Sequence, residues 1–177
     1  MKRKIKLFGN MKVLCTAAIL TALAVVIAYL CKFMTFGSIR ITFENLPIIL
    51  SGYLFGPWVG LIVGLASDLL NTAVSQYGIG GINPIITLGA ATVGFMAGLP
   101  YSKKNGLRLG IGVVLAHILG NMIIKSIGLK VFYSYPLVAL LPRVPLYAVI
   151  GIIEFFLLYF ITRSSALTRA MGGKNEL

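Results

Sequence analysis

The sequence predicts an all-α membrane protein in which six transmembrane helices form a single integral membrane domain. The chain is 58% hydrophobic and has a mean hydropathy of +0.95. Only 11% of its residues are charged, whereas a soluble domain carries about 25%. Because a helical span needs about 20 residues, residues 1–177 accommodate six spans and no separate soluble domain.

The borders of the spans follow from apolar runs interrupted by glycine and proline. Pro47 and Pro84 fall in the first turns of their helices, where a missing N–H is tolerated. Gly56-Pro57 predicts a tight turn, and Gly60 and Gly64 have the spacing that lets two helices pack closely. We expect loops at about 33–42, 75–82 and 128–142, and spans at about 11–31, 43–55, 58–74, 83–99, 107–127 and 143–161.

The formal net charge of +12 reflects topology rather than nucleic-acid binding. Eleven of the 16 Lys and Arg residues fall in three clusters. With an even number of spans, all three clusters lie on the same side of the membrane. That side is the cytoplasm by the positive-inside rule, so both termini are expected there, in a bacterial plasma membrane. The clusters are Lys2, Arg3, Lys4, Lys6 and Lys12; Lys103, Lys104 and Arg108; and Arg163, Arg169 and Lys174.

Cys15 and Cys31 lie at opposite ends of the first predicted span. A rise of about 1.5 Å per residue separates them beyond disulfide reach. The chain has one histidine and no Cys/His cluster, so no metal site is expected. The basic start followed by an apolar run resembles a signal peptide, but the long run lacks a clear cleavage site and is interpreted as an uncleaved span.

Asp68 lies in an otherwise apolar span, where a carboxylate costs at least about 2.5 kcal/mol at the bilayer centre. The topology places it in the outer half of the membrane, with Asn71 on the same helical face. Asn83, Arg143, Arg40 and Lys32 are expected near the outer rim. Such a set predicts a site for an anionic ligand that also carries hydrogen-bonding groups.

Internal explanations for these polar residues remain open. Asp68 could pair with Arg143 or Lys125, and Arg143 could be an interfacial anchor. Glu154 could contact a ligand or pair with Lys125. His117, with Asn121 four residues later, is expected to be packed and hydrogen-bonded.

The sequence does not predict an enzyme. It has no nucleophile elbow, no metalloprotease motif and no nucleotide-binding glycine loop. Uphill transport would therefore need an ion gradient or another polypeptide. No internal repeat of the kind seen in secondary transporters is evident.

Residues 41–57, ITFENLPIILSGYLFGP, followed by Gly60-xxx-Gly64 and Ser67-Asp68, resemble the S components of energy-coupling factor (ECF) vitamin transporters. The resemblance covers nearly the whole chain. Glu44-Asn-Leu-Pro-Ile48 and Leu141-Pro-Arg-Val-Pro145 are most similar to the folate-specific member.

This resemblance implies high-affinity capture of folate outside the cell, with outward loops gating the pocket. It also implies docking, through the first helix, onto a transmembrane coupling subunit driven by two cytoplasmic ATPases. Folate is then the transported ligand and no cofactor is expected. The alanines Ala18, Ala22, Ala24 and Ala28 would form the docking face.

For folate, Asp68 and Asn71 would bind the pterin edge, with Glu154 as the other possible carboxylate and Asn83 nearby. Aromatic rings would stack on the ligand, and Arg40 and Arg143 would neutralise its glutamate. The aromatic candidates are Phe43, Tyr77, Tyr133 and Tyr135. Another vitamin (riboflavin, thiamine or a queuosine precursor) and a non-transporting structural subunit are the alternatives.

Overall fold

The computed structural model describes residues 11–31, 35–36, 39–40, 42–74, 83–102, 105–134 and 136–164. It confirms the all-α class. The only strands in these ranges are the two-residue pair β1 (Thr35–Phe36) and β2 (Ile39–Arg40), an antiparallel ladder inside the expected loop 33–42. The helical elements are α1 (Met11–Cys31), α2 (Asn45–Phe55), α3 (Pro57–Val74), α4 (Pro84–Gly98), η2 (Leu99–Ser102), α5 (Gly106–Leu115), η3 (Ala116–Ile124), α6 (Lys125–Tyr133), α7 (Leu137–Leu140) and α8 (Arg143–Arg163).

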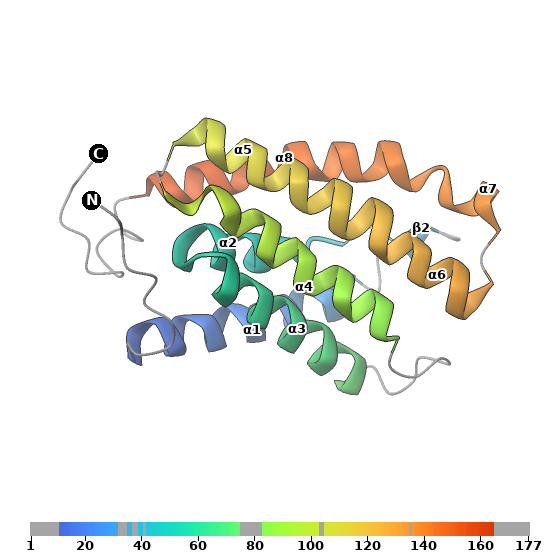
Figure 1. Cartoon of the computed structure of the whole chain (residues 1–177), viewed down its shortest axis with the longest axis horizontal. Helices are drawn as coiled ribbons and strands as arrows, with labels where there is room; N and C mark the ends of the chain where they lie inside the picture. Colours follow the sequence, from blue (N-terminus) through green and yellow to red (C-terminus); the bar gives the residue numbers. More distant parts are fainter. Residues whose placement is uncertain are drawn as a thin grey trace.

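The long helices run roughly along the longest axis of the molecule (Figure 1). α1 and α3 lie on one side and α5, α6 and α8 on the other, with α4 between them. α4 is the central helix, because it packs against α2, α3, α5, η3 and α6. The start of α1 and the end of α8 lie at the same end of the bundle (Figure 1), as an even number of crossings requires.

Four helical runs are long and apolar enough to cross a membrane: α1, α3, the run from α5 through α6, and α8. α2 and α4 are apolar but have 11 and 15 residues. At about 1.5 Å per residue they are shorter than the roughly 30 Å hydrocarbon core. Six apolar helical segments are therefore present, but two of them are shorter than the expected spans.

The predicted border at residue 127 was wrong, because the helix continues through η3 and α6 as one run, Gly106–Tyr133. Gly128 was expected to open a loop. It is instead buried in the helix, where a Cβ would lie 2.9 Å from Cγ1 of Ile86 on α4. Close packing against α4 explains the glycine. η3 itself is π-helical, a widened geometry that often marks functional sites.

Glycines bring the backbones of α2, α3 and α4 into direct contact. A Cβ on Gly94 would collide with the carbonyl oxygen of Gly60, and one on Gly64 with that of Ala90. The close packing predicted for Gly60 and Gly64 is confirmed. This contact fixes α3 against α4 and so holds Asp68 opposite Thr87.

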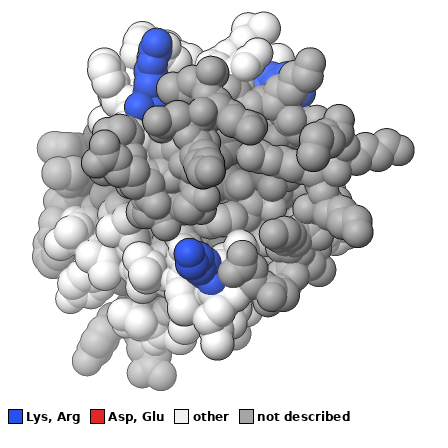
Figure 2. Space-filling view, turned by 90° about the vertical axis from the view of Figure 1, so that its left-hand side faces the viewer, with Lys and Arg blue, Asp and Glu red and all other residues white. Residues whose placement is uncertain are grey.

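The end of the bundle that holds the start of α1 carries positive charge. Lys12 begins α1, Arg108 lies in the first turn of α5, and Arg163 ends α8. Figure 2 views this end and shows Lys and Arg but no Asp or Glu among the described residues of the face. The positive-inside rule assigns this end to the cytoplasm. Large apolar side chains such as Leu107 and Phe160 are exposed on the flanks, as expected for a surface that contacts lipid.

Candidate ligand-binding site

A small cavity lies between α1, α2, α3 and α4. Its enclosed part has room for about one water molecule in this structure. Its walls are mostly apolar, but two carboxylates line it. The lining residues are Ala24, Ala28, Glu44, Ile48, Ser67, Asp68, Asn71 and Ala90.

Asp68 is half-buried at this cavity. The Thr87 hydroxyl of α4 lies 2.7 Å from Oδ2 of Asp68 and donates to it. One turn further along α3, the Thr72 hydroxyl bonds the backbone oxygen of Asp68 at 2.9 Å. Thr87 thus orients the carboxylate, which together with Asn71 forms part of the cavity wall as the sequence predicted.

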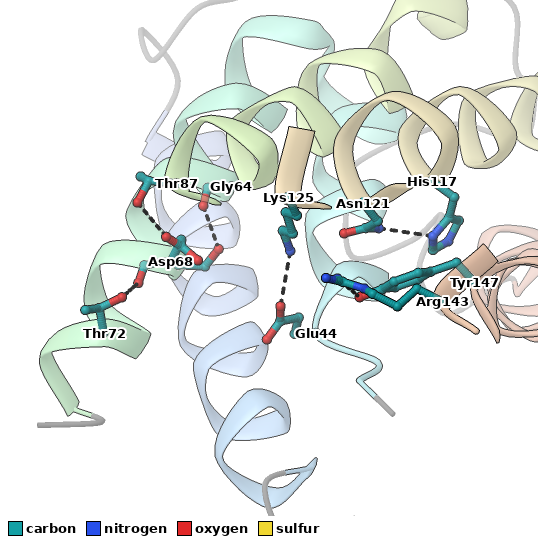
Figure 3. A network of polar contacts seen from close by, with 11 residues as sticks. Glu44, Gly64, Asp68, Thr72, Thr87, His117, Asn121, Lys125, Arg143 and Tyr147 are labelled. Carbon is teal, nitrogen blue, oxygen red and sulfur yellow. Dashed lines mark hydrogen bonds and ion pairs between the residues drawn. The ribbon is translucent and has the colours of Figure 1, made fainter. Parts of the chain in front are cut away.

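Glu44, the residue before α2, pairs with Lys125 of α6. Lys125 Nζ lies 3.3 Å from Oε1 of Glu44 (Figure 3). The possible pairing of Lys125 with Glu154 was therefore wrong. Because Lys125 is only 6% exposed, its charge would be costly without a carboxylate partner.

Glu154 instead bonds the single histidine. Its Oε2 lies 2.9 Å from Nε2 of His117. On the other side of the ring, Nδ1 of His117 lies 3.1 Å from Nδ2 of Asn121 (Figure 3). All three side chains are buried. The expectation that His117 is packed and hydrogen-bonded is confirmed.

Arg143 opens α8 and lies over Tyr147, one turn later. Its Nη2 donates to the Tyr147 hydroxyl at 3.2 Å, and the guanidinium carbon is 5.4 Å from the ring centroid. Its Nη1 is buried and has no hydrogen-bond partner within the described part of the chain. This geometry leaves a donor in place for a carboxylate from outside the chain.

Asn83, expected to bind ligand, has a structural role. Its Oδ1 accepts from the backbone N–H of Ile85 and Ile86 at 3.0 and 3.3 Å, and its Nδ2 donates to the carbonyl of Gly128 at 3.2 Å. It is thus the N-cap of α4 and a tie to α6. Both polar atoms of the amide make structural contacts, and the predicted ligand contact of Asn83 stays a prediction.

The structure describes only some of the aromatic side chains and cations that the sequence predicted around the ligand. Phe43 is half-buried just before α2, and Tyr133 is 37% exposed at the end of α6. Tyr77, Tyr135 and the side chain of Arg40 lie outside the described residues, as does Lys32.

The four alanines of α1 do not share one face. Ala18 and Ala22 are exposed, whereas Ala24 and Ala28 are each 1% exposed and line the cavity. A docking role for Ala24 and Ala28 is therefore contradicted, because their surface is already used inside the bundle. Ala18 and Ala22 remain available to a partner.

Sequence reasoning did not place Glu44 at the cavity or Thr87 beside Asp68, and it named Lys125 only as a possible partner of Asp68 or Glu154. Glu44 carried a signal, since it is one of only four acidic residues in the chain. Its contact with Lys125 joins residues 81 positions apart. Thr87 carried no such signal, because a threonine hydroxyl in a helix commonly bonds the backbone of its own helix.

Apolar helices with exposed apolar flanks surround a mostly apolar cavity that two carboxylates line, an arrangement typical of an integral membrane protein. The family described as "ECF transporter, substrate-specific component" matches residues 12–171. This chain belongs to that family, and the resemblance inferred from the sequence is confirmed. No curated protein matches the chain.

Among solved structures, the fold is similar to that of FolT bound with folic acid. The TM-score is 0.72 at 23% sequence identity, over 86% of this chain and 93% of FolT. At this identity the likeness establishes a shared fold. It agrees with the all-helical S component architecture that the sequence predicted.

Proposed function

We propose that this protein binds folate from outside the cell and serves as the substrate-binding subunit for its uptake. The observation that carries the proposal is Asp68, oriented by Thr87 at the wall of an apolar cavity. The shared fold with FolT, a protein solved with folic acid, supports the same ligand.

The chemistry of folate matches the polar groups of the site. The pterin edge offers two parallel N–H donors, which a carboxylate accepts in a bidentate manner. Asp68 would bind this edge and Asn71 would bind beside it, at the cavity that both residues line. The benzoyl linker and the glutamate would extend away from it.

The glutamate tail would bind the cations at the outer end of the bundle. Arg143 offers a buried N–H without a partner among the described residues, and Arg40 would add a second guanidinium. Arginine suits a carboxylate because its planar fork forms two parallel hydrogen bonds. The rings of Phe43, Tyr77, Tyr133 and Tyr135 would stack on the ligand.

Transport would require partners, as expected for an ECF S component. The exposed alanines Ala18 and Ala22 of α1 form a small-residue surface suited to close helix packing. They would dock on a transmembrane coupling subunit that two cytoplasmic ATPases drive, in a bacterial plasma membrane.

Ligand identification tests the proposal directly. The detergent-purified protein is denatured, and the released small molecules are analysed by mass spectrometry. Binding of folic acid, riboflavin and thiamine is then measured by calorimetry on the ligand-free protein. We expect a co-purified folate and a Kd for folic acid below about 1 μM. Tighter binding of another vitamin, or no binding of any, would contradict the assignment; the latter would favour a structural subunit.

A further inference from the structure

A buried hydrogen-bonded chain connects α8 to η3 outside the cavity described above. It runs from Glu154 through His117 to Asn121, with donor–acceptor distances of 2.9 and 3.1 Å. Glu154 and Asn121 are both 0% exposed. A carboxylate in the interior of a membrane helix is expensive, so its presence calls for a role.

The order of the bonds determines where the protons lie. With Glu154 ionised, its carboxylate oxygen accepts and Nε2 of His117 carries the hydrogen. In the neutral ring Nδ1 is then the acceptor, and it receives an N–H from Nδ2 of Asn121. The amide of Asn121 is thereby held in one of its two possible orientations.

This orientation leaves the amide oxygen of Asn121 facing the other way. The oxygen is buried and has no hydrogen-bond partner among the described residues. In Figure 3 it points away from His117, toward the side on which Lys125 lies. Buried polar atoms are nearly always hydrogen-bonded, so an unpartnered acceptor fixed by a carboxylate and a histidine indicates a ligand.

The surrounding structure holds the chain in place. Gly151 of α8 leaves room for the His117 ring, since a Cβ there would lie 3.1 Å from Cδ2. The Tyr147 ring flanks His117 with centroids 6.0 Å apart. Tyr147 and Glu154 lie on the buried face of α8, which also begins with the ligand-binding candidate Arg143.

We propose that Oδ1 of Asn121 accepts a hydrogen bond from an N–H group of the bound ligand. We assign Glu154 and His117 as positioning residues that fix the orientation of this amide. Oε1 of Glu154 is also buried without a partner among the described residues, so the double-mutant cycle below distinguishes this role from direct contact. The inference rests on the proposed function for the identity of the ligand, a folate rich in N–H donors. It replaces a direct role for Glu154 with an indirect one.

The histidine provides a test that needs no ligand. His117 is the only histidine in the chain, so ¹⁵N NMR of histidine-labelled protein, purified with a tag that lacks histidine, reports a single ring. We expect the Nε2–H tautomer in the wild type and in Glu154→Gln, whose amide oxygen can still accept, and a mixture of tautomers in Glu154→Leu. The Nδ1–H tautomer in the wild type would overturn the proposal.

A double-mutant cycle tests the effect on binding. Asn121→Leu is expected to weaken folic acid binding by about 10-fold, the value of one buried hydrogen bond. Glu154→Leu should weaken it less, Glu154→Gln hardly, and Glu154→Leu combined with Asn121→Leu no more than Asn121→Leu alone. Ile118→Leu, on the exposed side of the same segment, is the control.

The outcomes are separable. If the wild type fails to bind folic acid, the proposed function is wrong. The His117 tautomer measured by NMR still tests whether Glu154 positions the ring, because that experiment needs no ligand. If the wild type binds and Asn121→Leu binds equally well, the present inference is wrong. Additive losses in the double variant would show that Glu154 contacts the ligand itself.

Discussion

Lys125 Nζ and Glu44 Oε1 lie 3.3 Å apart although 81 residues separate them in the chain. The pair joins the start of α2 to α6 and so connects the two sides of the bundle. The side chain of Lys125 is 7% exposed and that of Glu44 is 17% exposed. The charge of Lys125 is therefore less well hydrated and depends more on its partner.

Breaking this pair is expected to destabilise the fold. Lys125→Met removes the buried cation, whereas Glu44→Gln removes the carboxylate that is paired with it, which costs about 3 kcal/mol for a buried pair. Thermal unfolding in detergent should therefore show a larger loss for Glu44→Gln than for the combined Glu44→Gln and Lys125→Met. Equal loss in the single and double variants would contradict a stabilising ion pair.

Asp68→Asn is expected to weaken folic acid binding by about 10- to 100-fold, because hydrogen bonds to a charged group contribute about 1.5–3 kcal/mol. Thr72→Val is the matched control, since its hydroxyl bonds the backbone oxygen of Asp68 and not the carboxylate. Calorimetry on both variants decides the point. Folic acid affinity of Asp68→Asn within two- or three-fold of wild type would rule out the pterin role.

Arg143→Gln should weaken binding of folic acid by about 10-fold while leaving pteroic acid, which lacks the glutamate, nearly unaffected. The buried Nη1 of Arg143 is the donor lost. The ratio of the two dissociation constants is the measurement. An unchanged ratio would show that Arg143 is a structural anchor on Tyr147.

The two faces of α1 should respond differently to larger side chains. Ala22→Leu is expected to retain folic acid binding but to reduce assembly with the coupling subunit in co-purification. Ala24→Leu should impair folic acid binding or folding, because Ala24 is 1% exposed at the cavity. Intact assembly and transport with both Ala18→Leu and Ala22→Leu would place the docking surface elsewhere.

Gly94→Ala is expected to destabilise the protein by about 1–3 kcal/mol, because the added methyl group would collide with the backbone of Gly60. Gly110→Ala is the control: its Cβ would meet only the Phe155 ring, at 3.4 Å, and alanine favours a helix. Unfolding temperatures of the two variants should differ clearly. Similar values would argue against a tight α3–α4 contact.

The sequence predicted much of the fold because membrane helices follow from local composition. Hydropathy located the helices, and the Gly60 and Gly64 spacing predicted the close contact with another helix. The pattern failed at Gly128, where a glycine that packs against α4 has the same local appearance as one that ends a helix. It also could not separate Ala22 from Ala24, since both belong to the same small-residue pattern.

The candidate site was predicted less completely. Asp68 was found because a charge in an apolar helix is costly wherever the helix packs, and Asn71 because it lies one turn later on the same helical face. Their polar partners were not, because side-chain contacts across the bundle depend on how the helices rotate against each other.

The sequence by itself determined the class of protein, the number of helical segments and the side of the membrane that holds the basic ends, because these depend on residue types and their order. Only the tertiary structure decided which carboxylate meets which partner. By charge alone Lys125 could pair with Glu154 or Glu44. The fold selects Glu44, because α2 and α6 both pack against α4 and this brings Glu44 within 3.3 Å of Lys125. Glu154 is left to His117, whose ring fits over Gly151, because hydrogen bonds act only over short distances that packing sets.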